Sequence, residues 1–65
     1  MKISLDVAYV IAQGGSGLDR VHIESEEEIT TPLEGAESVV RGLIEWKSRI
    51  EQRRGPILLT ALRVA

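Results

Sequence analysis

The stretch 31–56, TPLEGAESVVRGLIEWKSRIEQRRGP, decides most of the fold of this chain. It opens on a capping box in which Thr31 is the N-cap, Pro32 the first helical residue and Glu34 the third. It closes on Gly55-Pro56, where Gly suits a left-handed C-terminal position and Pro cannot continue a helix. These two signals predict one long helix over 32–54.

Apolar residues recur every three or four positions along this helix, the spacing of a single buried face. The stripe comprises Leu33, Ala36, Val39, Val40, Leu43, Trp46, Lys47 and Ile50, with Lys47 at its edge. Glu37 and Arg41, like Glu45 and Arg49, are spaced for ion pairs on the opposite side. The pattern predicts a helix that covers a sheet.

Strand patterns flank the helix on both sides. Residues 2–12 alternate with period two, and the Gly-rich cluster Gln13–Gly17 follows as a hairpin loop. Leu18–Ser25 is a shorter, polar strand suited to a sheet edge, with Val21 and Ile23 inward and Arg20, His22 and Glu24 outward. Ile57–Val64 is apolar on both faces, which is typical of a strand covered on both sides.

The predicted fold is α+β: a small β-β-α-β unit with a three-stranded mixed sheet and one long helix packed on one face. The hairpin makes the first two strands antiparallel, and the helical crossover brings the third strand parallel to the second. We place the third strand beside the first, because the second resembles an edge. The whole chain, 1–65, is one domain.

The size of the chain favours association. A domain of about 60 residues buries only about 60% of its unfolded surface, and chains this small usually gain a disulfide, a metal or a partner. The sequence has 65 residues, no Cys and one His, so no disulfide and no metal site are expected. A homo-oligomer, most simply a dimer, is therefore the leading hypothesis.

A second apolar surface is expected on the sheet face away from the helix, where exposed apolar groups indicate an interface. The residues predicted to form it are Ala8, Val10 and Ala12 from the first strand and Ile57, Leu59 and Ala61 from the third. Two arrangements fit: third strands paired edge to edge across a two-fold axis, or outer faces stacked.

The charged clusters suggest a different class of function, a regulatory binder of nucleic acid or an acidic partner through Arg49, Arg53 and Arg54. Nucleic acid is not the expected partner, because the net charge is −2 and only 3% of residues are aromatic. The Glu24–Glu28 run suits a solvated strand end or a docking patch for a basic protein.

The sequence offers few signs of catalysis or of cofactor binding. The loop Gly14–Gly17 lacks the Lys of a phosphate-binding loop and leads into a strand, so it predicts a turn. An enzyme with a site between subunits is a third hypothesis, with His22, Asp6 and Arg63 as its residues. Without a nucleophile–base pair or a cofactor motif, we expect no enzyme and no cofactor. The composition predicts a cytoplasmic protein with no membrane segment and itself, or another protein, as partner.

Overall fold

The computed structural model describes residues 2–24 and 31–65. The elements, in chain order, are β1 (Lys2–Ile11), β2 (Ser16–Glu24), α1 (Pro32–Arg54) and β3 (Ile57–Val64). The β-β-α-β order and both ends of the helix agree with the prediction. The hairpin loop is shorter than predicted, because β2 begins at Ser16. Gly14 and Gly15 make this turn possible with φ of 120° and 99°.

The three strands form one sheet in the order β2-β1-β3. β1 pairs antiparallel with both neighbours, so the predicted mixed sheet is wrong and every ladder is antiparallel. The cause is the central position of β1. β2 and β3 do point in the same direction, as expected, but they are not neighbours in the sheet because β1 lies between them. The placement of β1 between the other strands, with β2 at an edge, is confirmed.

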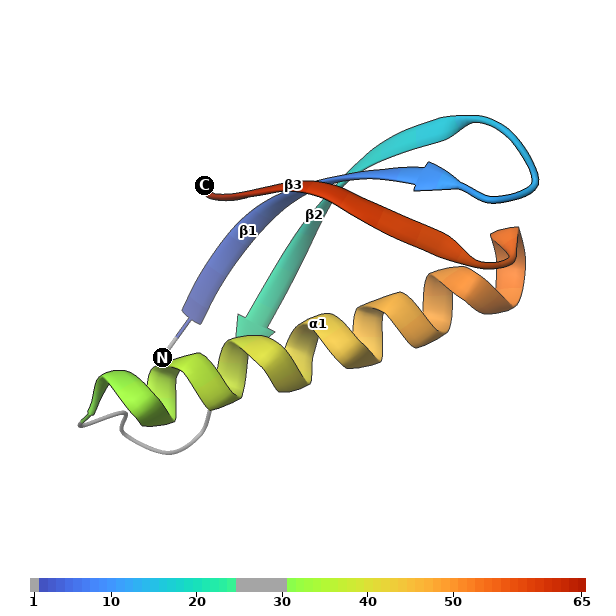
Figure 1. Cartoon of the computed structure of the whole chain (residues 1–65). Coiled ribbons are helices and arrows are strands. Elements are labelled where there is room, and N and C mark those ends of the chain that lie inside the picture. The colour runs from blue at the N-terminus through green and yellow to red at the C-terminus, as the bar shows by residue number, and fades with distance from the viewer. Residues whose placement is uncertain (1, 25–30) are drawn as a thin grey trace.

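The helix α1 packs along one face of the twisted sheet (Figure 1). Its N-cap Thr31 accepts a hydrogen bond from the Glu34 amide through Oγ1 at 3.2 Å, with Pro32 as the first helical residue. At the other end Gly55 has φ of 80° and donates its amide to the Glu51 carbonyl at 2.9 Å. Both helix ends are therefore formed by the residues that predicted them.

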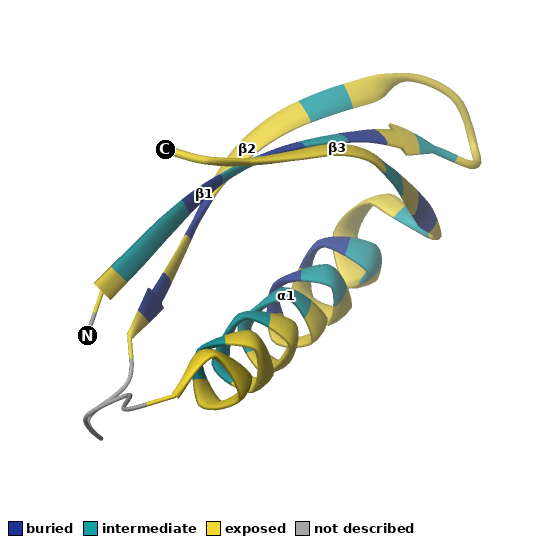
Figure 2. Cartoon of the chain, turned by 60° about the vertical axis from the view of Figure 1, so that its left-hand side comes forward, coloured by how far each residue is buried: buried dark blue, intermediate teal, exposed yellow. Residues whose placement is uncertain are grey.

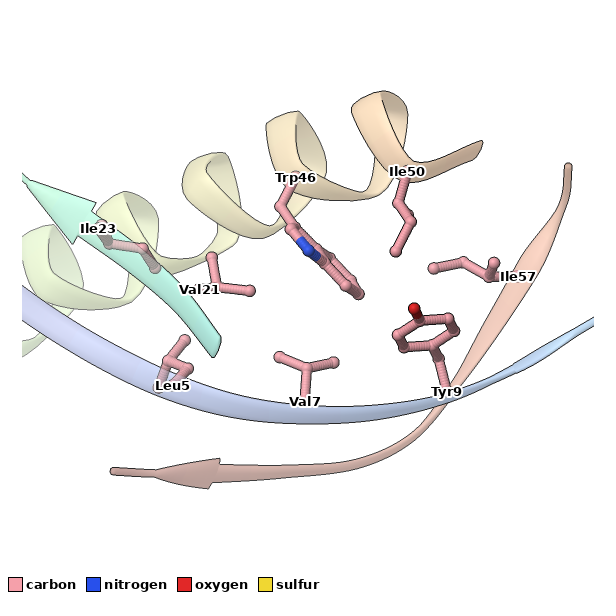
Figure 3. Close-up of a cluster of buried hydrophobic side chains, with 8 residues drawn as sticks. All are labelled: Leu5, Val7, Tyr9, Val21, Ile23, Trp46, Ile50 and Ile57. Atoms are coloured by element: carbon pink, nitrogen blue, oxygen red, sulfur yellow. The ribbon is translucent and has the colours of Figure 1, made fainter. Parts of the chain in front are cut away.

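The core is a layer of apolar side chains between α1 and the sheet (Figure 3). Its members are Leu5, Val7, Tyr9, Val21, Ile23, Trp46, Ile50 and Ile57. The Trp46 and Tyr9 rings meet edge to face, with centroids 5.7 Å apart. The Trp46 indole nitrogen Nε1 donates to Asp19 Oδ2 at 2.7 Å, so its polar group is satisfied at the rim of the core.

The helix covers the sheet along a diagonal. Near its C-terminus Ile50 lies beside Ile57 at the start of β3, and further back Gly42 lies against Ile23 at the end of β2. β3 becomes exposed along its length as the helix diverges from it (Figure 2). The expectation that β3 is covered on both sides is therefore wrong for the monomer, in which β3 is an edge strand.

Close approach of helix and sheet depends on Gly42. A β-carbon at this position would lie 2.6 Å from Ile23 Cγ1 and 2.9 Å from its Cδ1. Ile23 is buried and β-branched, so it has little freedom to move away. The glycine is thus required by packing, although it weakens the helix as an isolated element.

We predict that Gly42→Ala destabilises the protein by about 1–2 kcal/mol through overpacking. Intrinsic helix propensity alone predicts the opposite change, a gain of about 1 kcal/mol. Urea unfolding followed by Trp46 fluorescence measures the sign. In an Ile23→Ala background, where the obstructing atoms are gone, the same substitution should be neutral or stabilising; a stabilised single variant would contradict the packing argument.

Candidate functional site

The sheet face away from α1, which we call the outer face, has an apolar half near the hairpin. In the observed register Val10 pairs with Leu58, and Ala8 pairs with Leu18 on one side and Ala61 on the other. Of the six residues predicted for an interface, Ala8, Val10 and Ala61 do lie on this face. Ala12 is exposed in the turn beyond β1.

The other two predicted interface residues lie on the opposite side of the sheet. Ile57 pairs with Ile11 and is buried in the core, and Leu59 pairs with Tyr9 and packs against the core. Their assignment to the outer face is therefore wrong, and Leu58 lies there instead.

An irregularity in β3 explains why, of the three β3 residues predicted to lie on the outer face, only Ala61 does so. Tyr9 pairs with Leu59 but Ala8 pairs with Ala61, so Thr60 is an extra residue in the ladder. Strict alternation from Ile57 would put Ile57, Leu59 and Ala61 on one face. The bulge reverses the alternation after Leu59. Alternation alone could not reveal it.

The other half of the outer face is polar. Asp6 accepts from Arg20 Nε through Oδ1 at 2.9 Å and lies 3.5 Å from Arg63 through Oδ2. The hydrogen bond from Arg20 is the main cause of the lowered pKa of Asp6, with Arg63 adding to it. Two of the residues suspected of catalysis, Asp6 and Arg63, are thus brought together as an exposed cross-strand ion pair.

His22, the third suspected residue, lies opposite Ser4, and Ser4 Oγ is 2.9 Å from His22 Nδ1. A serine–imidazole pair can in principle be a nucleophile and base. Here it is exposed on an open sheet face, and within residues 2–24 and 31–65 no carboxylate bonds to the imidazole. The sequence predicted a cross-strand polar contact for His22 but not its partner, which the hairpin register determines.

A third apolar surface lies on the helix side of the sheet, and no pattern in the sequence indicated it. Leu62 and Val64 pair with Val7 and Leu5, so they point toward the helix side, yet they are 50% and 71% exposed. On α1, Val40 and Ile44 are 55% and 63% exposed. We call these four residues the open flank.

Contacts of α1 with β2 and with β3 show which side of the helix each residue occupies. Gly42 and Trp46 contact β2, through Ile23 and Asp19. Glu51 contacts β3. Val40, Ile44 and Lys47 precede Glu51 at steps of four, three and four, so they share its side of the helix.

Glu51 joins the helix to β3. Its Oε2 accepts from the Ile57 amide at 2.9 Å, and its Oε1 pairs with Lys47 Nζ at 3.3 Å. The hydrogen bond from the Ile57 amide is the main cause of the lowered pKa of the Glu51 carboxyl, and Lys47 adds to it. Beside this pair is a shallow hollow lined by Ile44, Lys47, Ser48, Glu51 and Gln52.

The two edges of the sheet differ in charge. β2 carries Asp19, Arg20, His22 and Glu24, and Glu24 pairs with Lys2 at 3.2 Å. β3 carries a single charged residue, Arg63. Charged side chains on an edge strand oppose pairing with another chain, so β2 is protected and β3 is not.

The arginines predicted as a polyanion contact, Arg49, Arg53 and Arg54, are exposed near the C-terminal end of α1. Trp46 is 5% exposed and Tyr9 4%, so neither ring offers a stacking platform for bases. This arrangement gives little support to nucleic acid as the ligand.

Other sites have limited structural support. Residues 25–28 of the Glu24–Glu28 run lie outside the described residues. Among those described, no three acidic or His side chains are grouped to hold a metal ion. No helix in the described ranges has both the length and the apolar character needed to cross a membrane.

Comparisons with protein-family models, curated proteins and solved structures found no match. Indications of function therefore come from the surfaces of the chain itself. Their most distinctive feature is the unprotected edge of β3, with the open flank beside it.

We predict that acid removes the stability that Glu51 contributes. A lowered pKa means that the ionised carboxylate stabilises the fold above its ordinary value of 4.5, and that this contribution is lost as the pH falls through the folded-state pKa. Glu51→Gln should therefore have a lower free energy of unfolding than wild type at pH 7, and the difference between the two proteins should narrow below pH 4.5. Denaturant unfolding across this range measures the gap.

The matched control is Glu45→Gln, which removes the same charge from an exposed position of α1. This variant should keep the wild-type loss of stability in acid, because Glu51 is intact. A constant gap between wild type and Glu51→Gln from pH 7 to pH 3 would contradict the role assigned to Glu51.

Proposed function

We propose that this chain is a small non-enzymatic cytoplasmic protein that acts as a homodimer, with two copies of β3 paired antiparallel across a two-fold axis. The observation that carries the proposal is the edge of β3: apolar, almost uncharged and bordered by the open flank. Such pairing makes one six-stranded sheet whose two helices share a face.

The surface area of the monomer supports a missing partner. The chain exposes 4818 Å², whereas a compact monomer of 7.2 kDa is expected to expose about 4,100 Å². The excess of about 700 Å² is close to the roughly 800 Å² that each partner contributes to a standard interface. The radius of gyration, 12.6 Å against about 10.7 Å for a compact domain, agrees.

Pairing at the β3 edge removes the unprotected strand edge, which stacking of the outer faces would leave exposed. It also sets Leu62, which is half-exposed on the helix side of the sheet, against its own copy. The outer face does carry large exposed apolar side chains, Val10, Leu18 and Leu58, but half of this face is ionic. The sheet edge is therefore the preferred arrangement.

The bulge at Thr60 limits where β3 can pair, because bulges disrupt the regular spacing of an edge. The half beyond it, Ala61–Val64, remains regular. Placing Leu62 opposite its own copy puts Arg63 opposite Ala61 of the second copy, whereas a shift of one residue would set the two Arg63 side chains against each other. We therefore centre the ladder on Leu62.

We predict that Leu62→Glu weakens the dimer by at least tenfold while the monomer stays folded. A charge buried at the centre of an interface is costly, but Leu62 is half-exposed in the monomer. Light scattering over a dilution series gives the mass, and circular dichroism on the same samples reports folding.

Val10→Glu is the matched control, because it places the same charge on the outer face. It should leave the mass of a dimer unchanged. If Val10→Glu dissociates the dimer and Leu62→Glu does not, the outer faces form the interface. A wild-type protein that is a stable monomer at every concentration contradicts the homodimer altogether.

A further inference from the structure

The polar half of the outer face carries an uneven cluster of charges beside the free edge of β3. Asp6, Arg20 and Arg63 lie side by side, one from each strand, so the cluster has one negative and two positive charges. Lys2 and Glu24, a second ion pair on this face, balance each other. Each copy therefore brings one excess positive charge close to the edge at which we place the dimer.

Arg63 is the member of this cluster that can bind a further ligand. Arg20 already bonds to both carboxylate oxygens of Asp6, at 2.9 and 3.5 Å, and is the main cause of its lowered pKa. Arg63 makes a longer contact with Asp6, at 3.5 Å, and its side chain is 82% exposed. A guanidinium has five N–H donors, so this contact leaves most of them available.

The backbone of β3 suits the ladder centred on Leu62. The Ala65 amide donates to the Ser4 carbonyl at 2.9 Å, so the backbone groups of Ala65 point toward β1. This direction alternates along an antiparallel strand, so the backbone groups of Leu62 point to the free edge. Leu62 and its own copy then form a hydrogen-bonded pair. Arg63 and Ala61 of the second copy form the adjacent non-hydrogen-bonded pair, in which side chains lie closer together.

The same ladder brings the two copies of Arg63 to the two-fold axis. With Arg63 opposite Ala61 of the second copy, the two Arg63 residues become diagonal neighbours about 7–8 Å apart. Arg63 pairs with Asp6 and Ala61 pairs with Ala8, so all of them lie on the outer face. Ala61 is small and exposed, so it leaves room above the sheet between the two guanidinium groups. One ligand on the axis is therefore within reach of both.

The chemistry of this place favours a phosphate group. Guanidinium groups bind phosphate through two parallel hydrogen bonds, and Arg is the preferred residue for this contact. The two clusters together have two excess positive charges, which repel each other across the axis. A dianion bound between them balances this charge.

We propose that the outer face of the dimer binds a phosphate group on its two-fold axis, between Arg63 of one copy and Arg63 of the second copy. This inference rests on the homodimer proposed above, because neither copy holds the complete site. It makes the affinity of the dimer depend on the concentration of inorganic phosphate or of a small phosphate monoester.

The test measures the dissociation constant of the dimer by fluorescence anisotropy of one labelled copy, in chloride and in phosphate at equal ionic strength. We expect the constant to fall roughly tenfold in about 10 mM phosphate, for an anion that binds the axis with a dissociation constant of about 1 mM. Titration calorimetry should give one phosphate per two chains. Glycerol 2-phosphate in place of phosphate separates the sources: an equal effect indicates a monoester, and no effect indicates the free ion.

Arg63→Gln should abolish the response to phosphate. In chloride its dimer should be at least as tight as wild type, because the repulsion across the axis is gone; a merely structural role for Arg63 predicts a weaker dimer instead. Arg63→Lys keeps the charge without the paired donors, so its response should fall to about threefold. Arg49→Gln is the matched control, because it removes the same charge from an exposed position of α1 and should keep the full response.

The outcomes separate the two proposals. A protein that is monomeric in both chloride and phosphate refutes the homodimer, and this inference with it. A dimer whose dissociation constant is the same in both salts, or whose response survives in Arg63→Gln, refutes the phosphate site and leaves the β3 contact standing. A response that depends on Arg63 and not on Arg49 supports both.

Discussion

One helix has to cover three strands, and it is too narrow to do so. A helix with its side chains is about 10 Å wide, whereas three strands spaced about 4.8 Å apart need nearly half as much again. The chain meets this constraint by laying α1 diagonally from the start of β3 to the end of β2. The contacts between the helix and the sheet follow from that diagonal, including the close approach at Gly42 and the hydrogen bond from Ile57 to Glu51. The uncovered end of β3 follows from it too.

The helix was largely predictable because its signals are local. The capping residue Thr31 and the terminal Gly55 act on neighbouring amides, so sequence alone locates both ends. The β1–β2 pairing was predictable for the same reason, since a short Gly-rich loop leaves little choice. Inward positions such as Val21 and Ile23 followed from alternation.

What the sequence could not provide depends on contacts between distant segments. The width of the apolar helix stripe did not reveal that Val40 lies on the β3 side of α1, where it is 55% exposed. Nor did composition show that Gly42 is a contact, because a glycine in a helix resembles a weak point until Ile23 is placed against it. The faces of β3 were misassigned for a related reason: an extra residue in a ladder leaves no mark in an apolar strand.

The three surfaces of the monomer suit different roles. The β2 edge is charged and resists pairing with another strand. On the polar half of the outer face, Asp6 is already paired with Arg20 and Arg63. Apolar surface is left on the helix side of β3 and around Ala8 on the outer face. In the homodimer that we propose, the first of these becomes part of a larger core whose other half belongs to a second copy.

The single extra residue at Thr60 reverses the side-chain alternation of β3. Upstream of it, odd-numbered residues of β3 face the helix, and downstream of it even-numbered residues do. If Thr60 entered the ladder opposite Ala8, no side chain would change, but Leu62 and Val64 would turn outward and Arg63 would face the helix side. Deleting Thr60 would instead leave a uniform ladder with the observed pairs, because Ala61 would follow Leu59 directly and stay opposite Ala8. The polarity of half a strand thus depends on where the backbone leaves one residue unpaired, and not on which side chains the strand carries.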